Sequence, residues 1–119
     1  MSSQPEQLRD RTKSFALRVI RLFRSLPYRT DCQVLGKQLL RCSTSVAANY
    51  RAACRARTKV EFIAKMGIVV EESDEAILWL ELLTESGIVS TEKTESLLSE
   101  AHELTAIFTS SRRTARGVA

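Results

Sequence analysis

Apolar and small residues recur at alternating steps of three and four along four stretches of the chain, and this spacing limits the possible folds more than any other sequence feature. Residues spaced in this way share one face of an α-helix. No stretch alternates with a period of two, so strands are not expected. The sequence therefore predicts an all-α protein. The four seams are Leu8, Thr12, Phe15, Val19, Leu22 and Leu26; Leu35, Leu39, Cys42, Val46, Tyr50 and Ala53; Phe62, Met66, Val69, Ser73, Ala76, Leu80 and Leu83; and Leu97, Ala101, Leu104 and Phe108.

Capping residues and helix stops set the expected helix bounds. Pro27 ends the first helix, and Asp31 can cap the second. Thr58 and Glu61 have the spacing of a capping box, and Gly87 has the position of a left-handed helix stop. We expect one domain over residues 1–119 with helices at about 6–26, 31–57, 59–86 and 91–112 and a flexible basic tail at 112–119. Short loops between long helices predict an antiparallel up-down-up-down four-helix bundle.

Basic and acidic residues are divided between the two halves of the chain. Residues 1–59 hold thirteen Lys/Arg against three acids, a net charge of +10, whereas residues 60–111 hold two Lys against eleven acids, a net charge of −9. Three arginines in the last eight residues bring the sum to +4. Such asymmetry indicates an anionic partner, either nucleic acid or a membrane surface. Arg outnumbers Lys by thirteen to five, and its planar fork suits phosphate, so nucleic acid is favoured.

Helical projection places the cations of the first two predicted helices on outer arcs, away from the apolar seams. The first arc carries no acid, and the second continues into the following turn. The alternative is that these basic helices pair with the acidic ones, within the bundle or between subunits, although exposed ion pairs contribute little and would not require such segregation. The residues that we expect to contact nucleic acid are Arg11, Arg18, Arg21, Arg24, Lys37, Arg41, Arg51, Arg55, Arg57 and Lys59.

The second half of the third predicted helix is apolar nearly all round. One core buries only an arc of a helix, and Leu78, Trp79 and Leu82 lie outside that arc. A solvent-facing Trp among leucines is typical of a protein interface, so we expect a homo-oligomer. The alternative is a wide core stripe in a tightly wrapped monomer.

Residue types that carry catalysis or bind cofactors are scarce. His102 is the only histidine, and Ser99 stands where a Glu-x-x-His metal motif needs its glutamate. No nucleophile set or glycine-rich phosphate loop is present, so we expect neither an enzyme nor a cofactor or metal site. Cys32, Cys42 and Cys54 do not form a Cys-x-x-Cys pair and are interpreted as reduced thiols. No signal peptide or membrane-spanning run is recognised, so a cytoplasmic protein without a membrane partner is expected.

Two segments carry a resemblance to a known family. They are Gln38-x-x-Arg41-x-x-x-Ser45-Val46-x-Ala48-Asn49-Tyr50 and, after it, Lys59-x-Glu61-Phe62-Ile63. The chain resembles the bacterial four helix bundle protein family, which includes proteins encoded within intervening sequences of large-subunit ribosomal RNA genes. It is also similar to the accessory variability proteins of diversity-generating retroelements. Many members carry Ile-Pro-Ala-Asn-Ile-Ala-Glu-Gly where this chain has residues 46–53, so a role tied to that Glu is not carried over.

The resemblance implies a four-helix protomer that assembles into a homopentamer, with proposed nucleic-acid binding and no catalysis. In the retroelement relatives it implies binding to a reverse transcriptase and RNA. Gln38, Ser45 and Asn49 fall at the edge of the second seam, where we interpret them as further oligomer-interface residues. The first hypothesis is an oligomeric module that binds RNA or single-stranded nucleic acid through phosphates. The alternative is a protein adaptor that docks an acidic partner, such as a reverse transcriptase, without binding nucleic acid itself.

Overall fold

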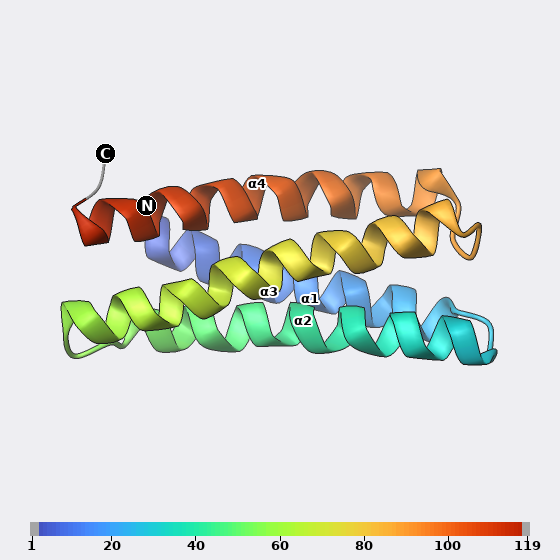
Figure 1. The fold of residues 1–119 in the computed structure, drawn as a ribbon, viewed down its shortest axis with the longest axis horizontal. Coiled ribbons are helices and arrows are strands. Elements are labelled where there is room, and N and C mark those ends of the chain that lie inside the picture. Colours follow the sequence, from blue (N-terminus) through green and yellow to red (C-terminus); the bar gives the residue numbers. More distant parts are fainter. Residues whose placement is uncertain (1–2, 118–119) are drawn as a thin grey trace.

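Four helices make up the computed structural model, which describes residues 3–117. They are α1 (Gln4–Ser25), α2 (Thr30–Cys54), α3 (Lys59–Glu85) and α4 (Thr91–Arg116). No strand occurs between residues 3 and 117, so the prediction of an all-α fold is confirmed. In Figure 1 the chain passes to the right along α1, back along α2, to the right along α3 and back along α4. Both described chain ends therefore lie at the same end of the molecule as the α2–α3 connection.

Helix α1 begins two residues before the predicted start because it has a capping box of its own. Ser3 Oγ accepts a hydrogen bond from the Glu6 amide at 3.3 Å, and the Glu6 carboxylate accepts one from the Ser3 amide at 3.3 Å. Pro5 lies in the first turn, where its missing N–H leaves no helical hydrogen bond unmade. The signal is local and readable in the sequence.

The second helix differs from the prediction at its start and its end, whereas the third begins where it was predicted to begin. Arg29, not Asp31, is the N-cap of α2, while Asp31 lies in the first turn and accepts a hydrogen bond from the Cys32 amide at 2.9 Å. Helix α2 ends at Cys54, before the predicted residue 57. Thr58 caps α3 as expected, accepting from the Glu61 amide at 3.0 Å.

Glycine residues end the last two helices in the left-handed conformation. Gly87 has φ +82°, and the Val89 amide turns back to the Leu83 carbonyl at 3.0 Å, as expected for this helix stop. Helix α4 runs to Arg116 and is capped by Gly117 at φ +74°. The prediction of a flexible tail is thus wrong for residues 112–116, which complete α4. Residues 118 and 119 of that tail, and residues 1 and 2 of the expected domain, lie outside the described residues.

The predicted seams form one core. Helix α4 contributes Phe108, whose ring centroid lies 5.2 Å from that of Tyr50 on α2. Leu22, Leu26, Leu35 and Phe62 are half-buried at the margins of the core and pack against it. The remaining seam residues are buried, and the largest fully buried side chains are Phe108, Leu39, Met66, Leu80, Leu83, Leu104, Val19 and Val69.

Neighbouring helices pack in chain order, and this order positions the charged surfaces. Helix α1 packs mainly on α2, α2 on α3 and α3 on α4, while α1 and α4 touch only sparsely. Close approach of α1 to α2 is possible at Gly36, because a Cβ there would lie 2.6 Å from Leu26 Cδ1 and 2.9 Å from Phe23 Cδ1. The two basic helices are therefore direct neighbours (Figure 1). Within residues 3–117, no helix combines the length and apolarity that a membrane crossing needs.

Candidate nucleic-acid interface

Arg11 lies on the side of α1 that faces the acidic helix α4. Its Nη2 lies 2.6 Å from Glu100 Oε1 and 3.1 Å from Glu103 Oε1, and its Nε donates to Glu100 Oε2 at 3.1 Å. The hydrogen bond to Glu100 raises the pKa of the Arg11 guanidinium. The arc carries no acid of α1 itself, but α4 supplies two, so at Arg11 the alternative of pairing with an acidic helix within the bundle holds.

Arg41 of α2 is held by two acids of α3. Its Nη1 donates to both Glu72 oxygens, at 3.2 and 3.1 Å, and its Nη2 donates to Glu75 at 3.0 Å and to Cys42 Sγ at 3.3 Å. The Arg41 Nε donates to Gln38 Oε1 at 3.3 Å. The Arg41 guanidinium thus donates five hydrogen bonds to residues of its own chain. We call Arg41, Cys42, Glu72 and Glu75 the Arg41 cluster.

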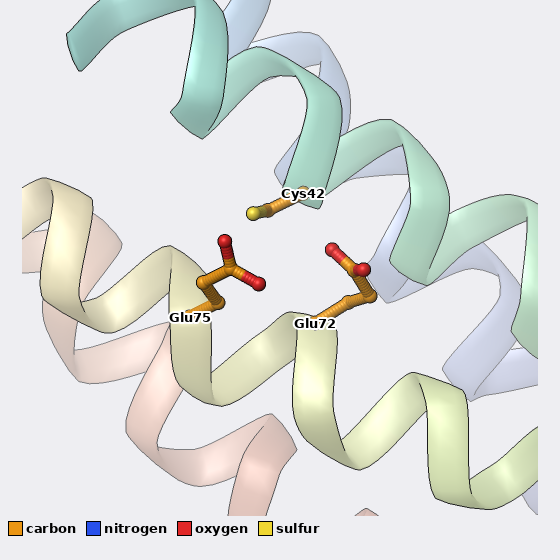
Figure 2. A group of neighbouring side chains, drawn as sticks. All are labelled: Cys42, Glu72 and Glu75. Carbon is orange, nitrogen blue, oxygen red and sulfur yellow. The ribbon is translucent and has the colours of Figure 1, made fainter.

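Three members of this cluster form the one group among residues 3–117 with the ligand types of a metal site. Cys42 points from α2 toward Glu72 and Glu75 on α3 (Figure 2), and one ligand atom of each lies within 4.8 Å of the others. Burial raises the pKa of the Cys42 thiol to about 12, so the sulfur is protonated at neutral pH. The Arg41 guanidinium supplies the positive charge that the two carboxylates need.

Two other predicted contact residues also find partners in the chain. Arg57, in the connection before α3, has its Nε 3.6 Å from Glu61 Oε2, four residues further along the chain. Arg18 Nη2 donates to Ser96 Oγ at 2.7 Å and lines a hollow that also contains Glu92 and Glu95. A phosphate approaching Arg18 would therefore meet acidic groups of α4.

Six predicted contact residues are exposed and lie beyond ion-pair distance of every carboxylate in residues 3–117. Two of them lie at the α1–α2 junction, Arg51 in the last turn of α2 and Arg55 as its C-cap. Both lie beside cations of α1. The six are Arg21, Arg24, Lys37, Arg51, Arg55 and Lys59.

A groove between α1 and α2 gathers four cations. Arg9 and Lys13 of α1 face Arg51 of α2 across a hollow of about 390 Å³, and Arg9, Arg51 and Arg55 surround an adjoining hollow of about 270 Å³. None of the four has an ion-pair partner in the described part of the chain. We call Arg9, Lys13, Arg51 and Arg55 the basic groove. The sequence interpretation left Arg9 and Lys13 out of the contact set, although Arg9–Lys13 and Arg51–Arg55 share the i, i+4 spacing of one helix face.

Between its cations, the basic groove is lined by short side chains and by Leu17. Ala16 of α1 and Thr44, Ala47 and Ala48 of α2 line the larger hollow, and Asp10 is the one acid at its edge. Short side chains allow a bulky ligand backbone to come close to the helices, while the arginine forks remain at the rim. The arrangement can bind several phosphates of one strand by charge and hydrogen bonding.

The comparisons with known proteins agree with this architecture. The model of the 23S rRNA-intervening sequence protein family matches residues 7–110. The chain belongs to that family. A solved structure of a protein with unknown function from the S23 ribosomal protein family, from Bacteroides thetaiotaomicron, is 32% identical with a TM-score of 0.83. The match covers 89% of this chain and 98% of that one. No curated protein matches the chain.

In this intervening-sequence family member, the expected interface residues of α2 bond mainly to one another and to their own helix. Asn49 Nδ2 donates to the Ser45 carbonyl and to Ser45 Oγ, both at 3.0 Å, and Gln38 accepts from Arg41. All three side chains are half-buried. Their part in an oligomer interface stays a prediction.

The expected interface residues of α3 divide into two kinds. Leu78 and Leu82 are 46% and 39% exposed, as the sequence suggests. Trp79 is half-buried and packs against the core, and its Nε1 is buried without a hydrogen-bond partner in the described residues. The expectation of a solvent-facing Trp79 is wrong because Trp79 follows Glu75 by one turn and so lies on the flank of α3 that faces α2.

Proposed function

We propose that this chain is a non-enzymatic, homo-oligomeric module, built on an antiparallel up-down-up-down bundle, that binds RNA through phosphates in the basic groove. The observation that carries the proposal is the set of four cations gathered around mainly short side chains with one acid nearby. Arg11, Arg41 and Arg57 are excluded from the primary contact set because acids of the chain already hold them.

The chemistry of the groove favours phosphate contacts over base reading. Arg9, Arg51 and Arg55 present planar forks that match phosphate oxygens, and phosphate contacts position a strand without reading its sequence. Membership of a family described by a ribosomal RNA intervening sequence supports RNA as the nucleic acid. Binding of this kind depends mainly on charge and is expected to tolerate many sequences.

A salt titration of RNA binding tests the proposal. The full chain is mixed with a fluorescently labelled single-stranded RNA, and the affinity is measured at several salt concentrations. Each phosphate contact on a single strand contributes about −0.7 to the slope of log affinity against log salt, so four contacts give a slope of about −3. Binding that does not weaken with salt, or no binding at low salt, contradicts the proposal.

The homo-oligomer is proposed from the outer face of α3. Ile68, Leu78 and Leu82 expose 38%, 46% and 39% of their surfaces, and apolar side chains left exposed together are a feature of protein interaction sites. The family resemblance implies a pentamer. Sedimentation of the purified chain is expected to give a mass above that of the 13.4 kDa protomer, and Leu78→Gln with Leu82→Gln is expected to lower it. A wild-type monomer at high concentration would contradict this part of the proposal.

Leu17 favours a second candidate function. It lines the basic groove with 42% of its surface exposed, so the groove also suits an acidic amphipathic helix. The chain would then act as an adaptor for an acidic partner, such as a reverse transcriptase, without touching nucleic acid. If excess RNA fails to displace such a partner, and neutralising Arg51 and Arg55 leaves RNA binding unchanged, the adaptor function is the better description.

A further inference from the structure

The connection between α1 and α2 presents an aromatic ring to water. Tyr28 is 95% exposed, more than any other large hydrophobic residue in residues 3–117. It lies at the end of the bundle away from the described chain ends, where the loop residues 26–29 join the two basic helices (Figure 1). An aromatic face left in water beside cations is a feature of proteins that stack nucleobases.

A hollow of about 290 Å³ adjoins the Tyr28 ring. Val34 on the first turns of α2 exposes 55% of its surface there and supplies a second apolar wall. Lys37 is exposed one turn further along and lies beyond ion-pair distance of any carboxylate in the described chain. We call this place the Tyr28 hollow, lined by Tyr28, Arg29, Thr30, Gln33, Val34 and Lys37.

Asp31, which directly follows Thr30 of the Tyr28 hollow in the sequence, does not give the hollow a net negative charge. Asp31 Oδ1 lies 3.5 Å from Arg29 Nε and accepts the Cys32 amide at 2.9 Å. The backbone hydrogen bond holds the pKa of Asp31 below its usual value, so the carboxylate is ionised and balances Arg29. Lys37 then remains as the unbalanced charge at the hollow.

We propose that the Tyr28 hollow binds one unstacked nucleobase of an RNA strand, with Tyr28 stacking on the base, Val34 packing against it and Lys37 contacting the adjoining phosphate. This inference rests on the proposed RNA binding, and it adds a contact that only a single-stranded RNA can make. Bases in a duplex are paired and stacked, whereas bases in a single strand are available to an aromatic ring. The chain therefore prefers single-stranded RNA to duplex RNA.

Paired measurements on two RNAs test the Tyr28 hollow. A labelled single-stranded RNA and the same strand annealed to its complement are bound to the full chain at one salt concentration. Stacking on one aromatic side chain predicts that Tyr28→Ala lowers the single-strand affinity by about tenfold and leaves the duplex affinity unchanged. Tyr28→Phe keeps the ring and is expected to bind as the wild type does. Because Tyr28 is almost fully exposed, neither change is expected to alter folding.

Val60→Ala provides a matched control, since Val60 is 79% exposed on α3 and lies outside the Tyr28 hollow. It is expected to change neither affinity. Equal binding of wild type and Tyr28→Ala to the single strand would overturn the inference, and salt-dependent binding to both RNAs would then leave the basic groove proposal standing. An equal loss on both RNAs, or a changed oligomer mass with RNA affinity intact, would also overturn it. If the wild type binds neither RNA at low salt, both proposals fall.

Discussion

Arg41 and Arg51 lie on the same helix, yet their surroundings are opposite. Arg41 makes hydrogen bonds to Glu72 and Glu75 of α3, whereas Arg51 lines the basic groove and lies beyond ion-pair distance of all carboxylates in residues 3–117. The difference comes from the neighbouring helix. A cation that faces an acidic helix is neutralised, and one that faces the other basic helix is not.

Helix α1 shows the same division. Arg11 faces α4 and binds Glu100, while Arg9 and Lys13 face α2 and line the basic groove. Because neighbouring helices in this bundle follow chain order, placing the basic residues in the first two helices makes those helices share a surface. Because the positive charges lie in the first half of the sequence, they gather where α1 packs on α2.

The largest expected difference between the two regions is in thiol reactivity. Cys42 of the Arg41 cluster is fully buried, whereas Cys54 is half-buried and lines a hollow together with Arg9, Arg51 and Arg55. We expect a thiol-alkylating reagent to modify Cys54 at least about 100-fold faster than Cys42, because Cys42 reacts only after the chain opens. Peptide mass spectrometry over a time course measures both rates. Bound RNA should slow the reaction at Cys54 only, and equal rates at the two thiols would contradict the distinction.

The next largest effect is expected in RNA affinity. Arg51→Gln with Arg55→Gln removes two phosphate contacts and is expected to weaken RNA binding by about 10- to 50-fold at moderate salt. Arg11→Gln with Arg41→Gln removes the same charge from ion-paired positions and is expected to weaken binding by less than about threefold. Fluorescence anisotropy at one salt concentration compares the two. Equal losses would mean that total charge, not the groove, governs binding.

Alkaline pH is expected to destabilise the protein through Cys42. A thiol in water has a pKa of 9.0, and burial raises the pKa of Cys42 to about 12 in the folded protein. The contribution of the protonated Cys42 thiol to the free energy of unfolding is complete below pH 9. It is lost as the pH rises toward 12, because the thiol of the unfolded chain ionises first. Cys42 alone should lower the free energy of unfolding by about 1.4 kcal/mol between pH 8 and 10. Urea unfolding of Cys42→Ala should show a smaller decline, retaining the part due to Tyr50, whose pKa burial also raises.

Removal of the Arg41 guanidinium has the smallest expected effect. Arg41→Gln leaves Glu72, whose side chain is 17% exposed, next to Glu75 without a cation. Because Arg41 itself is half-exposed and screened by water, we expect a loss of about 1 kcal/mol or less in the free energy of unfolding. Adding Glu72→Gln and Glu75→Gln should restore most of it. If the acid substitutions do not restore the free energy of unfolding, then the packing of the Arg41 side chain, and not its charge, stabilises the protein.

The sequence predicts the helices and the core well because both depend on local spacing. Thr58, Gly87 and the four seams are recognisable one helix at a time, and Ser3 with Glu6 is an equally local signal that the sequence interpretation missed. Asp31 shows the limit of such signals, since a residue suited to capping lies just inside the helix and bonds to the next amide.

The candidate site could be predicted only in part because it depends on which flank of each helix meets which neighbour. The helical projection of α1 places Arg11 and Lys13 alike on an outer arc, but α4 covers one and α2 adjoins the other. A projection of a single helix does not include the neighbouring helices. For this reason Trp79 looks exposed in the projection of α3, although in the folded protein it packs against the core. Composition shows that cations are abundant, and only the assembled bundle shows which of them lack partners.

The dependence of RNA affinity on salt, measured for three forms of the full chain, tests the central claim most directly. For the wild type we expect a slope of log affinity against log salt of about −3, from four phosphate contacts at about −0.7 each. Arg11→Gln with Arg41→Gln should keep that slope, and Arg51→Gln with Arg55→Gln should reduce it to about −1.5. A slope that changes equally in both double variants, or in neither, would contradict the assignment of RNA binding to the basic groove.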